Sequence, residues 1–172
     1  SGGGSLVTGI LSATNTIDVT NSAGDVSLAG TVASSDLVVT SSGAVTDGAD
    51  GDLAISGSAQ LTGGSIELGN DAGNTTNFGS LTFNSVGSVT ISEDSSLDLV
   101  GVNTAGSADL DSTAAVSDAG ATSVDITGLL DVSGTEITLG SGSFNAGTTT
   151  FNSAGSVTIS EDSSLDLVGV NT

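Results

Sequence analysis

FNSVGSVTISEDSSLDLVGVNT, residues 83–104, returns as FNSAGSVTISEDSSLDLVGVNT, residues 151–172. The two stretches differ at one position, where the first has Val86 and the second has Ala154, and they are 68 residues apart. Self-similarity at a fixed spacing is the sequence signature of a repeat architecture. The chain is therefore expected to be a repeat protein, in which the two near-identical stretches occupy equivalent structural environments.

The repeat extends upstream of this stretch. Residues 45–69 resemble residues 116–140 at an offset of 71 residues, three more than the offset of the later stretch. The length difference lies in residues 70–78 against 141–144, which are predicted to form a loop of different length in the two copies. The long repeat is thus about 70 residues, and it is interrupted only where the chain can turn.

These offsets divide the chain into four parts. The predicted parts are a linker-like start, divergent coils, a first repeat copy and a second repeat copy, at residues 1–5, 6–44, 45–104 and 105–172. All but the first are expected to form one continuous solenoid. Because the pattern stops partway through a copy, the chain is interpreted as a fragment of a longer repeat protein.

Short apolar–polar–apolar triads recur throughout, as in Val89-Thr90-Ile91 and Leu97-Asp98-Leu99. Alternation places the outer two residues on one face of a strand and the middle residue on the other. Gly, Ser, Asn and Asp separate the triads and favour turns. The sequence predicts an all-β protein.

Triads this short bury too little surface unless they stack. Burial of two apolar side chains stabilises the fold by about 3–6 kcal/mol. The loss of conformational entropy costs about 1–2 kcal/mol for each ordered residue. Coils of ~20 residues, stacked roughly eight deep, would form a continuous core. The expected fold is an elongated right-handed parallel β-helix (β-solenoid), with the four phenylalanines as interior fillers: Phe78, Phe83, Phe144 and Phe151. A tandem β-sandwich array is the alternative, although such domains usually carry Trp or Tyr in their cores.

Composition narrows the function. The chain has no Lys, Arg, His, Cys, Met, Pro, Trp or Tyr, and its net charge is −20. Without cationic side chains, binding to nucleic acid or to an anionic membrane is not expected. Catalysis usually draws on His, Cys, Lys, Arg and Tyr, and of the reactive side chains only Asp, Glu, Ser, Thr and the amides remain, so no enzyme is expected. With 36% hydrophobic residues and a mean hydropathy of +0.30, the chain is expected to fold rather than remain disordered.

Several segments point to a family. Residues 87–91 (GSVTI), 41–47 (SSGAVTD) and 104–107 (TAGS) resemble repeats of large bacterial surface and secreted proteins, namely filamentous-haemagglutinin-like adhesins and autotransporter passenger domains. The resemblance is compositional and covers nearly the whole chain from Leu6. It implies a right-handed parallel β-helix, export from a bacterial cell, and a role as a stalk, fibre or adhesin.

Asp47, Asp50 and Asp52 form the candidate metal site. Three carboxylates spaced by Gly could wrap a hard cation with oxygen ligands, and calcium is the expected ion. The spacing matches neither an EF-hand loop nor the nonapeptide of calcium-binding β-rolls. A solvated acidic turn is the alternative. No other cofactor is expected.

Two further acidic pairs repeat, Glu93-Asp94 and Glu161-Asp162. They stand between triads and are interpreted as turns at a coil corner, with a column of aligned carboxylates as the alternative. Paired carboxylates also occur in glycosidases, some of which are β-helices, but the chain lacks an aromatic sugar platform. A polysaccharide-active enzyme is therefore the least favoured function.

The sequence thus predicts a structural segment of a bacterial extracellular fibre, sheath or surface protein. The alternative is the stalk of an adhesin that presents a separate binding head. Exposed coil ends favour head-to-tail self-association into filaments. Cell-surface or matrix components are the other expected partners, and the location is secreted or on the bacterial surface.

Overall fold

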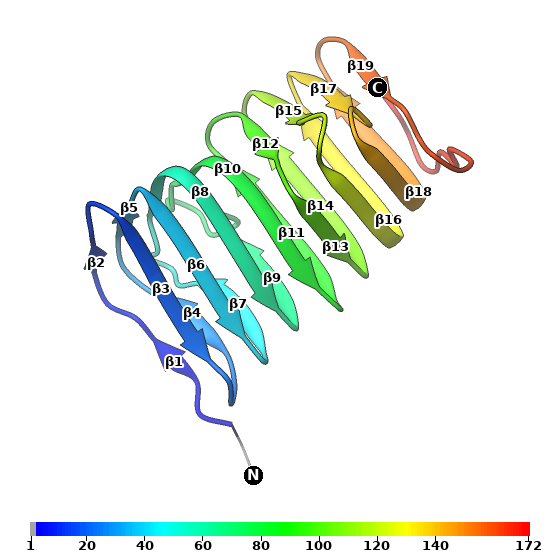
Figure 1. Ribbon diagram of the computed structural model, residues 1–172. Coiled ribbons are helices and arrows are strands. Elements are labelled where there is room, and N and C mark those ends of the chain that lie inside the picture. Colours follow the sequence, from blue (N-terminus) through cyan, green and yellow to red (C-terminus); the bar gives the residue numbers. More distant parts are fainter. Residues whose placement is uncertain (1–2) are drawn as a thin grey trace.

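The computed structural model describes residues 3–172, and these residues form strands and turns without any helix. The coils stack in one elongated row from the blue N-terminal end to the red C-terminal end (Figure 1). Within the same residues no helix is long and apolar enough to cross a membrane. Ser1 and Gly2 of the predicted linker lie outside the described residues.

Nineteen strands belong to one sheet that wraps around the core. The strands of the N-terminal half are β1 (Leu6–Val7), β2 (Leu11–Ser12), β3 (Thr16–Asn21), β4 (Val26–Leu28), β5 (Val32–Ser34), β6 (Asp36–Ser41), β7 (Ala44–Asp47), β8 (Leu53–Gly63), β9 (Ser65–Leu68) and β10 (Thr76–Ser85). The strands of the C-terminal half are β11 (Ser88–Glu93), β12 (Leu97–Leu99), β13 (Val102–Ala105), β14 (Ser107–Ser112), β15 (Ala115–Asp118), β16 (Ser123–Gly134), β17 (Glu136–Leu139), β18 (Ser143–Ser153) and β19 (Val157–Ile159).

All strand pairings are parallel, and each joins strands one coil apart. One ladder of register partners passes through Leu6, Val26, Val45, Ile66, Val89, Ala108, Leu130, Thr149 and Leu167. Successive members lie 18–23 residues apart, so the ladder makes about eight turns. The predicted β-solenoid and its coil length are confirmed. The β-sandwich alternative is wrong, because sandwich sheets pair their strands antiparallel.

Each coil has three strand-forming sides joined at corners. In the N-terminal half, β6, β7 and the start of β8 stack on β3, β4 and β5. β8 then continues around the corner, and its second part pairs with β6. β8 has one more residue than β10 at this corner, where the register shifts between Phe78 and Ser80. Long strands that bend at a bulge therefore replace some of the isolated triads that the sequence predicts.

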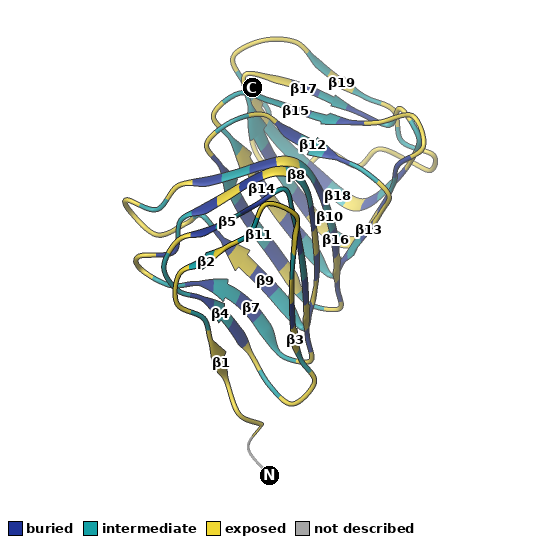
Figure 2. Ribbon diagram, turned by 60° about the vertical axis from the view of Figure 1, so that its left-hand side comes forward, coloured by how far each residue is buried: buried dark blue, intermediate teal, exposed yellow. Residues whose placement is uncertain are grey.

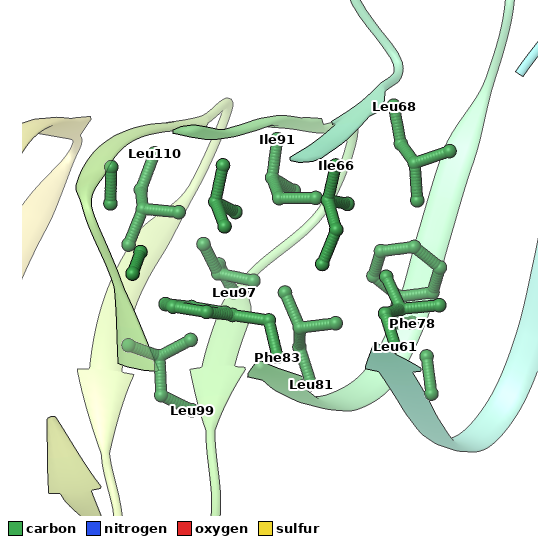
Figure 3. Packing of buried hydrophobic residues seen from close by; sticks show 14 of the residues in the cluster. Leu61, Ile66, Leu68, Phe78, Leu81, Phe83, Ile91, Leu97, Leu99 and Leu110 are labelled. Carbon is green, nitrogen blue, oxygen red and sulfur yellow. The ribbon is translucent and has the colours of Figure 1, made fainter. Parts of the chain in front are cut away.

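The core is one continuous cluster of Val, Leu, Ile, Ala and Phe side chains along the solenoid axis. Figure 2 shows buried and exposed positions alternating along the strands. In Figure 3, Phe83 packs among leucines contributed by neighbouring coils. Phe78, Phe83 and Phe144 are buried, and Phe151 packs against the core from a partly buried position, so the predicted filler role is confirmed.

The two repeat copies occupy different sides of the solenoid. Val89 belongs to the ladder that reaches Thr149 three coils later. The equivalent of Val89 in the second copy is Val157. It lies in β19, the strand that follows Thr149 of β18, and it pairs with Ile137 in a different ladder. One repeat therefore advances three coils and one strand. At about 4.8 Å for each coil, this is a rise of about 16 Å, with a turn to the next side.

An asparagine side chain closes one corner of each copy. Asn103 is fully buried; its Oδ1 accepts from the Phe83 amide at 3.0 Å, and its Nδ2 donates to the Val100 carbonyl at 3.0 Å. Asn171 makes the same two bonds to Phe151 and Val168 in the last coil, at 2.9 and 3.1 Å. The side chain thus supplies a carbonyl where the backbone turns away from the ladder.

We expect Asn103→Ala to lower the free energy of unfolding by about 1–3 kcal/mol, because the Phe83 amide loses its acceptor inside the core. Asn171→Ala is the matched control, since Asn171 makes equivalent bonds but is only partly buried. The measurement is urea denaturation followed by far-ultraviolet circular dichroism. Equal losses for the two variants would show that burial does not set the cost.

Candidate functional site

Asp47 is the last residue of β7, at a position of the strand that faces the interior, and it pairs in register with Leu28. It is 7% exposed. Its Oδ2 accepts from the Gly69 amide at 2.8 Å and from Asn74 Nδ2 at 3.3 Å. Its Oδ1 is buried without a hydrogen-bond partner. Burial raises the pKa of Asp47 above its usual range, against the lowering effect of these hydrogen bonds, and the charge of Asp71 raises it further.

The other two residues of the predicted site are placed differently. Asp50 is exposed in the turn after β7. Asp52 Oδ1 accepts from the amide and the hydroxyl of Thr75, both at 2.9 Å. Across residues 3–172 no three acidic groups are assembled as a ready-made metal centre. Calcium binding by Asp47, Asp50 and Asp52 stays a prediction, and of the three Asp47 has the buried oxygen that lacks a donor.

A polar pocket of about 230 Å³ lies beside Asp47. Its lining residues are Thr46, Asp47, Glu67, Asn70 and Asp71. Thr46 and Glu67 are register partners on consecutive coils, and Asn70 and Asp71 belong to the loop after β9. Asn70 Nδ2 donates to Glu67 Oε1 at 2.5 Å. Three of the lining residues are acidic, and they come from two coils.

Sequence reasoning missed Glu67 and Asp71, because they lie about one coil downstream of Asp47 and outside its local motif. The signal that could have found them is the three-residue length difference between the copies. The structure confirms that this difference lies in a loop, between β9 and β10.

The second copy lacks both pocket carboxylates. Asp118 is equivalent to Asp47, and its two carboxylate oxygens accept from the amides of Gly140 and Ser141, each at 3.0 Å. Thr138 stands where the first copy has Glu67, and the shorter loop has no counterpart of Asp71. The longer loop of the first copy thus leaves one carboxylate oxygen free and adds acidic neighbours.

The predicted corner role of the repeated acidic pairs is confirmed. Glu93 ends β11 and is 1% exposed. Its Oε1 accepts from the Phe78 amide and the Ser95 hydroxyl, both at 2.9 Å, and its Oε2 is buried without a partner. Burial raises the pKa of Glu93 to about 7, although the bond from Phe78 opposes the shift; the Asp94 charge raises it further. Asp94 Oδ2 accepts from the Thr76 amide at 2.8 Å.

The second copy repeats this chemistry. Glu161 accepts from the Ala146 amide at 2.9 Å, and Asp162 accepts from the Phe144 amide at 3.2 Å. In both copies the carboxylates accept hydrogen bonds from backbone amides of a neighbouring strand at a corner of the coil. Because the copies lie on different sides, the pairs do not form the aligned column considered as an alternative.

The outer face of β14 and β16 carries an acidic group of its own. Asp109 pairs with Asp131 in register. Partial burial raises the pKa of both carboxyls, and the charge of Asp111 contributes to each shift. With no basic side chain in the chain, mobile cations or protons must relieve this repulsion.

Residues 14–82 match a family model described as repeats of unknown function (DUF5649). The match covers less than half of the chain and includes all five residues that line the pocket. Neither a curated protein nor a solved structure matches the chain. The similarity supports a repeat-type protein and assigns no activity.

Proposed function

We propose that this chain is a non-catalytic structural segment of a bacterial extracellular fibre, sheath or surface protein. It acts through the length of the assembled solenoid, and copies associate end to end. The resemblance to filamentous-haemagglutinin-like and autotransporter repeats supports secretion or display on the cell surface. The continuous parallel ladder supports a rod, because each coil rests on its neighbours along one axis.

One comparison between the copies carries the proposal of self-association. Leu97 and Leu99 are fully buried, because β15 stacks on them. Their equivalents in the last coil, Leu165 and Leu167, are 43% and 45% exposed. In the first copy a further coil, paired in parallel, covers the equivalent apolar surface. In assemblies of the 172-residue chain we expect a coil from a second copy to make the same contacts.

Charge repulsion opposes this association. Each chain carries a net charge of −20, so two ends approach against mutual repulsion. Salt shortens the range of this repulsion to about 8 Å at physiological ionic strength. Assembly is therefore expected to increase with ionic strength, unlike an assembly held by salt bridges.

Sedimentation velocity tests the proposal. For the 172-residue chain we expect species larger than a monomer, increasing between 10 and 500 mM NaCl at fixed protein concentration. Leu167→Asp should abolish them, because it places a charge on the apolar end surface. Val86→Asp is the control, since Val86 is 89% exposed at a coil corner on the flank. A monomer at all salt concentrations, or equal loss in both variants, contradicts end-to-end association.

The stalk of an adhesin remains the alternative function, since a rod also holds a binding head away from a cell. An adhesin stalk works as a single rod and needs no end-to-end association. A strictly monomeric chain in the sedimentation experiment therefore favours the stalk over the fibre.

A further inference from the structure

We propose that residues 69–78 form a proton-controlled clasp, which is closed at acidic pH and opens locally as Glu93 loses its proton. The segment contains the loop between β9 and β10 and the first residues of β10. Its opening frees the start of β10 from β8, while the other coils stay stacked. The clasp does not depend on end-to-end association, because it lies within one chain.

Carboxylates hold four backbone amides of this segment. The accepting atoms are Asp47 Oδ2 for Gly69 at 2.8 Å, Asp52 Oδ1 for Thr75 at 2.9 Å, Asp94 Oδ2 for Thr76 at 2.8 Å and Glu93 Oε1 for Phe78 at 2.9 Å. The chain has no basic side chain to offset four carboxylates around one short segment. Their protonation therefore decides how firmly the segment is held.

Glu93 is the group whose ionisation opposes closure. It is 1% exposed in the closed clasp, and its Oε2 is buried without a hydrogen-bond partner. Burial raises the pKa of Glu93 to about 7, against the hydrogen bonds from Phe78 and Ser95, and the charge of Asp94 raises it further. β10 and β14, which pack against Glu93, place Phe78 and Ser112 beside it, and neither side chain titrates.

Asp47 acts in the same direction at the start of the segment. Its buried Oδ1 has no partner, burial raises its pKa, and the charge of Asp71 in the loop raises the pKa further. A carboxyl whose pKa is raised in the closed form stabilises closure fully below its pKa in the open form. This stabilisation is lost as pH rises through the closed-form pKa. Both ends of the clasp therefore weaken as pH rises.

The segment can open by itself because it has little apolar anchorage. Among residues 69–77 Thr76 alone is buried, and its hydroxyl lies inside without a partner. In the second copy Phe144 takes the position of Thr76, since they pair in register with the equivalent residues Val124 and Leu53. Phe144 is fully buried. Segments with few buried apolar contacts open at low free energy, so the opening is specific to the first copy.

Hydrogen exchange of the ¹⁵N-labelled monomer at pH 5 and pH 8, corrected for intrinsic exchange rates, tests the clasp. We expect the protection of the Thr76 and Phe78 amides to fall by about tenfold or more between these pH values. Their exchange should depend only weakly on urea, because a local opening exposes little surface. Amides of β16 should stay better protected, with the steep urea dependence of global unfolding.

Glu93→Gln should abolish the fall in protection, because the amide keeps an oxygen for Phe78 and carries no charge. Glu161→Gln is the matched control at the equivalent position of the second copy, and it should leave the fall unchanged. The proposal is overturned if protection is equal at both pH values, if Glu93→Gln retains the fall, or if the Thr76 and Phe78 amides exchange only by global unfolding at pH 8. None of these results bears on end-to-end association, which sedimentation measures separately.

Discussion

Leu97→Ala is expected to lower the free energy of unfolding by about 2–5 kcal/mol, whereas Leu165→Ala should lower it by less than about 1 kcal/mol. The two leucines occupy the same place in almost identical sequences, yet Leu97 is fully buried and Leu165 is 43% exposed. Truncation of Leu97 leaves a cavity between coils, because β15 and the neighbouring leucines cannot close around it. Truncation of Leu165 removes a side chain that water already reaches.

Urea denaturation of the two variants and the parent, at a protein concentration where sedimentation shows monomers, measures this difference. The comparison needs no correction for residue type or local sequence. Similar losses for both variants would mean that the next coil does not cover Leu97, and the stacking order of the solenoid would be wrong at that point.

The second large effect concerns pH. The folded protein raises the pKa of Glu93 from 4.5 to about 7, mainly through burial. A carboxyl with a raised pKa in the folded state stabilises fully below its unfolded pKa, and this stability is lost as pH rises through the folded pKa. The chain should therefore be most stable near pH 4–5 and lose about 3 kcal/mol from this one group by pH 8.

Glu93→Gln should remove this loss, because the amide keeps an oxygen for the Phe78 amide and carries no charge. At pH 8 the variant is expected to unfold at higher urea concentration than the parent; near pH 4.5 the two should coincide. Glu161→Gln is the control, since it removes one charge from the equivalent but less buried position. A parent chain whose stability rises between pH 5 and 8 would contradict the assignment to Glu93.

Much of the fold follows from the sequence alone. Alternation in triads such as Leu97-Asp98-Leu99 and turn residues between them define strands and corners, and the near-identical stretches require a repeated environment. The stacking of coils also follows, since isolated triads bury too little surface to fold. The path of β8 and β10 around a corner does not, because a bend at a bulge leaves no distinct pattern in the sequence.

The pocket was less predictable for a physical reason. Local spacing identifies Asp47 with Asp50 and Asp52, but a solenoid places each residue beside positions about one coil away. Glu67 reaches the pocket through its register with Thr46, which no local motif encodes. Likewise, Asn103 looks like a surface residue beside Gly101, yet it is buried to complete the hydrogen bonds of the corner.

Electron microscopy of the 172-residue chain at 500 mM NaCl tests the central claim most directly, namely that stacked coils form a rod that extends by end-to-end association. We expect unbranched filaments one solenoid wide, with an axial spacing of about 4.8 Å between coils. Leu167→Asp should yield short single rods under the same conditions. Isolated globular particles, or filaments whose strands run along the axis, would contradict the account.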